Sequence, residues 1–303
     1  MVIGLIACLA THSCDRSRSD SAAAATGHRK IASLVPAATD MLVGMGATDH
    51  LVAVSNFESA PEVADLPRVG DYQTTDWETL ARLRPDAMVV QVAPDHLPPG
   101  LQERARGLGI ELVNVRINRL EDVFDNIQRL GAVAGELEKG RIATRTLRER
   151  LDKLKAECAI RPSVRTLIVR DESGREVIGP GNFLDDLLTV VNATNVAGAL
   201  DKPYPSIDRE TLTTLKPDAV IVLLPAAKRE TLELSRRFWA SMTDVPAVRR
   251  GRVCAINDAY ALRPGPRLGD LAQRIADCLA EGGSAGGAAT TRRIETKAQE
   301  HKE

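Results

Sequence analysis

The sequence predicts an α/β protein of two lobes, each with a parallel sheet covered by helices, which are joined by a long helix. Three observations predict this class. Short β-branched runs alternate with helical patterns along the chain, a segment of the first half recurs in the second, and a long helical stretch separates the halves. The chain has 303 residues, of which 44% are hydrophobic, so it is large enough for two cores.

Candidate strands occur in both halves of the chain. In the first half they lie at residues 30–35, 51–56, 86–92 and 110–115. In the second half they lie at residues 165–171, 218–225 and 252–258. Because helical patterns separate these short runs, each half is expected to form its own α/β lobe, over residues 29–119 and 161–281.

The segment that connects the halves, residues 120–160, carries apolar residues at helical spacing. A continuous helix over this range would be nearly 60 Å long, at about 1.5 Å per residue, and would run past both lobes. Gly131, Gly135 and Gly140 lie within it and are able to bend or split it. The alternative is therefore two helices joined near Gly140.

The internal repeat is the strongest signal in the sequence. Residues 76–90 read DWETLARLRPDAMVV and residues 208–222 read DRETLTTLKPDAVIV, with nine of fifteen positions identical. Each copy is expected to be a short helix begun by an aspartate, ended before a proline and followed by a buried strand. Glu78 and Glu210 fall in the first helical turn, where the helix dipole favours negative charge. They either stabilise the helix starts or contact a partner.

The two ends of the chain differ from the lobes. Residues 2–10, VIGLIACLA, have the length of a signal-peptide core, and the residues before Cys14 and before Cys8 both loosely resemble a lipidation site. Cys14 is preferred, because Cys8 leaves almost no apolar core ahead of it. No positive residues precede the apolar run, so an unmodified, cleaved or disordered N-terminus is the alternative for residues 1–28. The tail at residues 282–303 lacks apolar periodicity and is expected to be disordered.

Composition excludes several functions. Lys and Arg number 40 against 41 Asp and Glu, which gives no field that would attract nucleic acid. The five cysteines show no paired spacing, so neither a disulfide framework nor a zinc site is expected. The five histidines are scattered singly, so no direct metal site is expected. An enzyme is disfavoured because GPGNF at 179–183 is an incomplete dinucleotide-binding motif and no nucleophile motif occurs.

The chain resembles the periplasmic binding proteins of cobalamin and ferric-siderophore ABC importers over residues 29–281. The matching segments are IASLVPAATDMLVGMGATDHLVAVSNFESAPE, LPRVGDYQTTDWETLARLRPDAMVV, VIGPGNFLDDLL, YPSIDRETLTTLKPDAVIV and INDAYALRPGPRLGDL. The resemblance implies a class III periplasmic binding protein fold: two Rossmann-like lobes joined by one long helix, with ligand held in the cleft between them. It also implies a receptor without catalytic activity, located outside the cytoplasm.

The resemblance further implies which residues contact the ligand. They are loop residues after the strands: Phe57, Tyr72, Tyr204, Asp258, Tyr260 and Arg263. Tyr72 and Tyr204 stand where the cobalamin receptors often have tryptophan, so the resemblance does not decide the identity of the ligand. A corrinoid is our first choice, and a ferric siderophore or haem is the alternative. Asp40 stands where the family commonly has glutamate, which we interpret as an exchange at a helix start.

The partners are implied in the same way. Glu78 and Glu210 match the two surface glutamates, one in each lobe, with which the family docks onto arginines of its permease. Two equivalent lobes suit an ABC permease made of two identical subunits with its ATPase subunits. The chain itself is expected to be monomeric, to need no cofactor beyond the transported metal chelate, and to bind no nucleic acid. A ligand sensor that does not transport is the remaining alternative.

Overall fold

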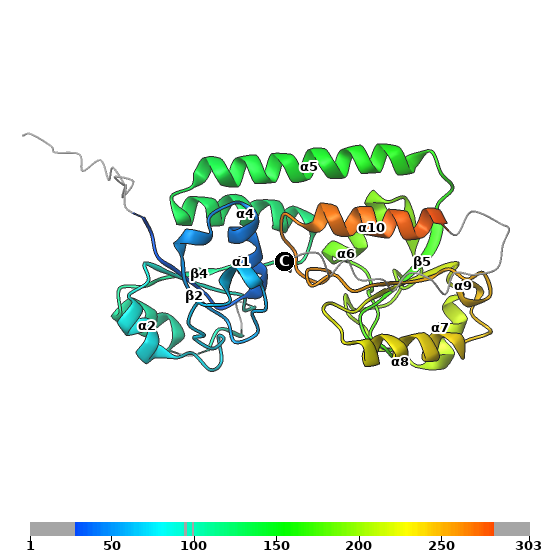
Figure 1. The fold of residues 1–303 in the computed structure, drawn as a ribbon, viewed down its shortest axis with the longest axis horizontal. Coiled ribbons are helices and arrows are strands. Elements are labelled where there is room, and N and C mark those ends of the chain that lie inside the picture. The colour runs from blue at the N-terminus through cyan, green and yellow to red at the C-terminus, as the bar shows by residue number, and fades with distance from the viewer. Residues whose placement is uncertain (1–27, 94–95, 99, 282–303) are drawn as a thin grey trace, which may run out of the picture.

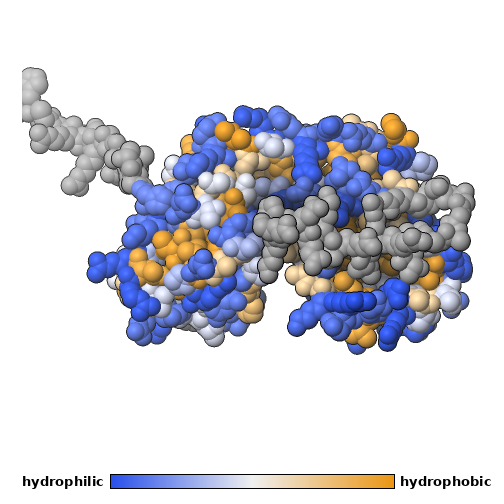
Figure 2. All heavy atoms as spheres, in the orientation of Figure 1, coloured by the Kyte–Doolittle hydropathy of each residue, from blue (hydrophilic) through white to orange (hydrophobic). Residues whose placement is uncertain are grey.

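The computed structural model describes residues 28–93, 96–98 and 100–281. Cys14 and the tail at 282–303 lie outside the described residues. Two lobes lie side by side beneath a long helix that spans them, as Figure 1 shows. On the side opposite this helix the lobes are separated by a notch, which Figure 2 shows. The predicted fold class is confirmed.

The N-terminal lobe is built on a parallel sheet with the order β2-β1-β3-β4. Its strands are β1 (Ile31–Ser33), β2 (Leu51–Val54), β3 (Ala87–Val90) and β4 (Glu111–Asn114). Its helices are α1 (Pro36–Gly44), α2 (Trp77–Leu83) and α3 (Leu101–Gly107), with 3-10 turns η1 (Thr48–His50) and η2 (Pro61–Val63). Strands β1 and β3 are buried throughout, as expected for the centre of a sheet covered on both faces.

The C-terminal lobe repeats this order as β6-β5-β7-β8, again all parallel. Its strands are β5 (Val164–Val169), β6 (Ala193–Asn195), β7 (Ala219–Leu223) and β8 (Val253–Ile256). Its helices are α6 (Phe183–Val190), α7 (Arg209–Leu215), α8 (Arg229–Ala240), α9 (Pro246–Arg249) and α10 (Leu268–Glu281). The two lobes are therefore copies of one unit.

The sequence repeat corresponds to a structural repeat in detail. Asp76 caps α2 by accepting a hydrogen bond from the Thr79 N–H at 3.0 Å. Asp208 caps α7 in the same way, with the Thr211 N–H at 2.8 Å. Both helices end in a residue of left-handed conformation that lies just before the proline. The expected order of cap, short helix and buried strand is confirmed in both copies.

The connecting segment is two helices, so the expectation of one continuous helix is wrong. Helix α4 (Leu120–Ala134) ends at Gly135, whose φ of 77° is a left-handed conformation that favours glycine. The chain then reverses into α5 (Leu137–Ala159), which packs along α4. Helix α5 has 23 residues, about 34 Å at 1.5 Å per residue, and it alone spans both lobes (Figure 1). The joint lies at Gly135 and not near Gly140.

One apolar core runs through both lobes. It includes side chains of β1 and α1 in the first lobe, of α4 and α5 between the lobes, and of β7, α6 and α10 in the second. Examples of fully buried members are Ile31, Ile127, Leu187 and Ile275. Because interiors pack as densely as crystals, a shared core restrains hinge motion between the lobes.

A disulfide joins Cys254 of β8 to Cys278 of α10, with their Cα atoms 6.0 Å apart. The expectation of no disulfide is therefore wrong. The two cysteines are 24 residues apart in sequence, and only the packing of α10 beside the sheet brings them within bonding reach. The bond closes a ring that contains the loop after β8, and disulfides are characteristic of oxidising extracytoplasmic compartments.

Candidate functional site

A pocket of about 290 Å³ lies between the two lobes. It is lined by segments that follow strands of both sheets. The lining residues are Val35, Pro36, Ala37, Gln91 and Ile117 from the first lobe, and Phe183, Tyr204, Leu262, Arg263 and Pro264 from the second. In open α/β sheets, ligands bind outside the carboxyl ends of the strands, and this pocket lies at that edge in both lobes.

The chemistry of the pocket is mostly apolar with a few polar groups. Aliphatic and aromatic side chains such as Ile117 and Phe183 form its walls, while Gln91, Tyr204 and Arg263 supply hydrogen-bonding groups. Partial burial raises the pKa of the Tyr204 phenol, an effect that the nearby Arg170 charge opposes. Tyr204 therefore stays neutral and available as a hydrogen-bond donor at physiological pH. Such a site suits a large ligand with an apolar face and a polar edge.

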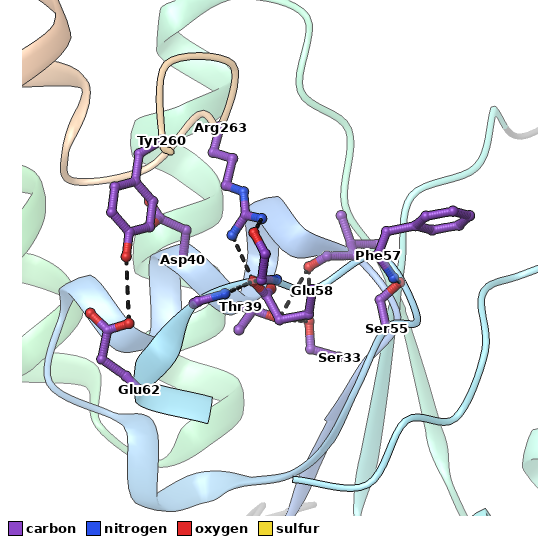
Figure 3. Close-up of polar contacts among 12 residues, drawn as sticks. Ser33, Thr39, Asp40, Ser55, Phe57, Glu58, Glu62, Tyr260 and Arg263 are labelled. Atoms are coloured by element: carbon purple, nitrogen blue, oxygen red, sulfur yellow. Dashed lines mark hydrogen bonds and ion pairs between the residues drawn. The ribbon is translucent and has the colours of Figure 1, made fainter. Parts of the chain in front are cut away.

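Two of the six predicted ligand residues, Tyr204 and Arg263, line this pocket. Phe57 lies outside the lining, is 70% exposed, and extends away from Arg263 in Figure 3. Tyr72 also lies outside the lining. It is half-buried against a second apolar cluster of the first lobe, which includes Leu80 and Met88. The loops of these two residues lie together, because the Asn56 N–H donates to the Gly70 carbonyl at 3.1 Å.

Asp258 and Tyr260 belong to the loop after β8, residues 257–267, and do not line the pocket. The Asp258 carboxylate forms an ion pair with Arg274 of α10 at 3.3 Å. The Tyr260 hydroxyl donates to Glu62 of the first lobe at 3.4 Å. The Arg267 guanidinium lies 3.5 Å from the centre of the Tyr260 ring, a cation–π contact. This loop of the second lobe therefore lies directly against the first.

The contacts of this loop form what we call the interlobe polar cluster, drawn in part in Figure 3. Its members are Asp40, Glu58, Ser59 and Glu62 of the first lobe and Tyr260, Arg263 and Arg267 of the loop. Arg263 Nη1 donates to Glu58 Oε1 at 2.6 Å, and its Nη2 donates to Ser59 Oγ at 2.8 Å. Charge-assisted bonds of this kind, shielded from water, fix both partners.

Asp40, like Glu58, has a fully buried side chain. It lies in the middle of α1, so its interpretation as a helix-start residue is wrong. Its Oδ1 lies 3.1 Å from Arg267 Nε. Burial raises the pKa of Asp40 to about 6, against the opposing charges of Arg267 and Arg263. Gly265 packs directly against it: a Cβ there would lie 2.2 Å from Asp40 Oδ2, so any other residue would force this carboxylate to move.

The raised pKa of Asp40 predicts a pH dependence of stability. The folded protein takes up a proton at Asp40 near pH 6, whereas the unfolded chain does so near its ordinary value of 3.8. Protonation of Asp40 therefore stabilises the folded state. This stabilisation is fully present below pH 3.8, the pKa in the unfolded chain, and is lost as pH rises through about 6, the pKa in the folded protein. Between pH 7 and pH 5 the free energy of unfolding should rise by about 1 kcal/mol in the wild type relative to Asp40→Asn.

Urea denaturation of both proteins at several pH values measures this difference directly. The variant serves as the control for all other titrating groups, including Asp76 and Asp208, whose pKa values the helix-capping bonds lower. The difference in the free energy of unfolding between wild type and Asp40→Asn should change between pH 7 and pH 5. If it stays constant, or changes with the opposite sign, the buried position of Asp40 is contradicted.

A second ionic contact joins the lobes near the pocket. Arg119, just before α4, donates from Nε to Asp186 of α6 at 3.0 Å, and the Leu120 N–H donates to the same carboxylate at 2.8 Å. Arg119 closely follows Ile117, and Asp186 closely follows Phe183, two residues of the pocket lining. Neither this pair nor Glu58 and Arg267 could be predicted from the sequence, because their partners are distant in the chain.

Glu78 and Glu210 are both exposed in the first turns of α2 and α7. The two helices lie on the side of the molecule opposite α5, one in each lobe, as Figure 1 shows. The side of the molecule on which α2 and α7 lie is the side where the notch between the lobes opens (Figures 1 and 2).

Comparison with known proteins identifies the family of the chain. The periplasmic binding protein family matches residues 31–260, well over half of the chain. The chain belongs to this family. The periplasmic binding proteins are receptors and not enzymes, so the expectation of a non-catalytic receptor is confirmed. Family membership also places the protein outside the cytoplasm. Among the described residues, no helix is both long and apolar enough to cross a bilayer.

Relatives of this periplasmic binding protein include vitamin B12-binding proteins. That of Vibrio cholerae is 25% identical over 251 residues, covering 82% of this chain and 88% of the relative. That of Vibrio parahaemolyticus is 27% identical over 240 residues, covering 78% and 84%. Both alignments therefore cover about four fifths of this chain.

Solved structures agree on the fold. The crystal structure of the periplasmic vitamin B12-binding protein of Vibrio cholerae superimposes with a TM-score of 0.70 at 25% identity, covering 84% of this chain and 98% of that one. A periplasmic haem-binding protein from Roseiflexus sp. RS-1 gives the same TM-score at 20% identity, covering 85% and 100%. The likeness to the haem-binding protein is one of fold alone.

Proposed function

We propose that this periplasmic binding protein captures a corrinoid in the pocket between its lobes and delivers it to an ABC importer. The observation that carries the proposal is the pocket itself: an apolar site formed by both lobes, in a chain that aligns with vitamin B12-binding proteins over most of both lengths. Large ligands of this type have an apolar ring face and an edge of amide groups, and the pocket offers partners for both.

The size of the pocket fits one part of such a ligand. At about 290 Å³ it lies at the lower end of the range of small-molecule sites, roughly 300 to 1,000 Å³. A corrinoid is larger than this, so the pocket would hold one edge of it, and the rest would lie in the notch between the lobes. Ile117 and Phe183 would pack against the ring, while Gln91 and Tyr204 would bind amide groups.

A panel of ligands tests the proposal. Purified protein is mixed with cyanocobalamin, cobinamide, a ferric hydroxamate siderophore and haemin, and binding is followed by changes in visible absorbance. We expect saturable binding of the corrinoids with a Kd tighter than about 100 μM, roughly 5.5 kcal/mol of binding free energy. Saturation by the siderophore or haemin alone would assign the protein to that ligand. Corrinoid binding without corrinoid uptake by cells would favour a sensor over a transporter.

Tyr204 is 42% exposed in the free protein, and the proposed ligand would cover it. Tyr204→Ala should then weaken corrinoid binding about 30-fold, because an aromatic anchor buried by its ligand typically contributes about 2 kcal/mol. Tyr72→Ala is the informative companion, since Tyr72 matches the family pattern but lies outside the pocket lining. A loss of affinity in both variants would mean that the ligand extends from the pocket to the loop of Tyr72. Wild-type affinity in Tyr204→Ala, with the fold intact by circular dichroism, would place the ligand elsewhere.

Delivery requires a partner, and the two exposed glutamates supply the contact surface. Glu78 and Glu210 would pair with arginines on the two identical subunits of a permease, which is energised by its ATPase subunits. Paired charges at such a surface mainly orient the encounter and raise its rate. A monomeric receptor suits this geometry, because its own two lobes supply the pseudo-twofold symmetry.

Anchoring through Cys14 is a further part of the proposal, supported by the apolar run before it and the polar segment after it. Metabolic labelling with palmitate in the native host should label the wild type and Cys8→Ala but not Cys14→Ala. Equal labelling of Cys14→Ala and the wild type would contradict this assignment.

A further inference from the structure

Among the described residues that line the pocket, Arg263 is the one with a charged side chain. Its side chain is only 13% exposed, and two of its guanidinium nitrogens are already bonded to the protein. Nη1 donates to Glu58 Oε1 at 2.6 Å and Nη2 to Ser59 Oγ at 2.8 Å. The positive charge at the pocket wall is therefore compensated before any ligand arrives.

Glu58 is held in place by the backbone as well as by Arg263. Its side chain is fully buried, and its Oε1 also accepts hydrogen bonds from the N–H groups of Ser59 at 2.7 Å and Ala60 at 2.8 Å. Three donors at one oxygen hold the Glu58 side chain in one position. The ion pair of Glu58 with Arg263 is thus a fixed feature of the site.

Two further arginines near the pocket are paired in the same way. Arg170 lies 5.3 Å from the ring centre of Tyr204 and forms an ion pair with Glu176 at 2.9 Å. Arg119 forms its pair with Asp186 beside the pocket residues Ile117 and Phe183. Each of these guanidinium groups therefore has a carboxylate of the protein as its partner.

We propose that Glu58 is a specificity-determining residue: by neutralising Arg263, it makes the pocket prefer ligands whose edge carries carboxamides over the same ligands carrying carboxylates. This inference rests on the proposed function, and it names the chemical class that the pocket selects.

The selection follows from the cost of moving charge out of water. A ligand carboxylate that enters the pocket must lose its hydration, which is unfavourable unless a free cation replaces it. Arg263 offers no free charge, and Glu58 beside it repels a second carboxylate. A carboxamide carries no charge and can exchange hydrogen bonds with Tyr204 and Gln91. Removing the Glu58 charge would leave Arg263 as an anion-binding group inside the pocket.

Matched ligand pairs test this inference. Cyanocobalamin is compared with its monocarboxylic acids, in which one propionamide is hydrolysed, and haemin is compared with its diamide. For the wild type we expect the amide form to bind at least tenfold more tightly than the acid. Glu58→Gln keeps an oxygen for the Ser59 and Ala60 N–H groups. In this variant the ratio of amide affinity to acid affinity should change at least tenfold in favour of the acid.

Arg263→Gln provides the opposite change, because it leaves the Glu58 carboxylate uncompensated. The ratio should then move further towards the amide form. Glu62→Gln is the control: it removes a charge of the interlobe polar cluster that pairs with Arg267 and not with Arg263, so the ratio should not change. A loss of structure would weaken binding of the amide and of the acid alike. Opposite shifts of the amide-to-acid affinity ratio in Glu58→Gln and Arg263→Gln would therefore indicate an effect of charge.

The outcomes are distinct from those that test the proposed function. If the corrinoids fail to bind and the haemin pair binds, the proposed ligand is wrong, and the role of Glu58 is decided on the haemin pair. An unchanged ratio in both Glu58→Gln and Arg263→Gln, or shifts in the same direction, would overturn the inference. Failure of both scaffolds to bind the wild type would overturn it together with the proposed function.

Discussion

Reversal of both exposed glutamates, Glu78→Lys together with Glu210→Lys, should abolish uptake and complex formation with the permease while leaving ligand affinity in solution unchanged. The two residues occupy equivalent positions in two copies of one unit, and neither lines the pocket. If they meet arginines of the permease, reversal replaces two attractive contacts with two repulsive ones. Each single reversal should be partly defective, because one contact remains.

The alternative interpretation gives a different result. If the glutamates only stabilise helix starts, lysine costs about 0.3 to 1 kcal/mol of stability, and transport survives. Glu138→Lys is a matched control, since Glu138 is an exposed glutamate in the first turn of α5, on the other side of the molecule. Normal uptake in the double variant, or an equal defect in Glu138→Lys, would end the docking proposal.

Loss of the Cys254–Cys278 disulfide should lower the free energy of unfolding by about 3.5 kcal/mol, the amount that chain entropy predicts for a ring of this size. Ligand affinity should fall as well, because the ring contains the loop that places Arg263 in the pocket. Reduction of the wild type and the double substitution Cys254→Ser with Cys278→Ser should have the same effect in urea denaturation.

The double variant also controls for the reductant. Once the disulfide is absent, adding reductant should change nothing further, since the other described cysteine, Cys158, is free and buried. Wild-type stability in the double variant would show that α10 is held to the sheet by packing alone.

The parts of the fold that were predicted from sequence are those with local signals. The repeat predicted its caps at Asp76 and Asp208 because an N-cap bond joins residues only three positions apart. The break between α4 and α5 also had a local signal, but each of three glycines, Gly131, Gly135 and Gly140, was a possible position for it. Only Gly135 takes a positive φ, and the sequence carries no information that selects it.

The parts that could not be predicted depend on contacts between distant residues. Glu58 and Arg263 are 205 positions apart and meet only because the loop after β8 lies against the first lobe. Asp40 has no feature in sequence that distinguishes a buried ion pair from a helix-start residue. The cysteines of the disulfide follow no recognisable spacing, since their separation is set by the path from β8 to α10.

Isothermal titration of the wild-type protein with cyanocobalamin shows directly whether one corrinoid binds between the lobes. We expect one ligand per chain, a Kd tighter than about 100 μM, and a negative heat-capacity change from burial of the apolar pocket walls. No saturable heat with cyanocobalamin or cobinamide, under conditions where the protein is folded, would contradict it.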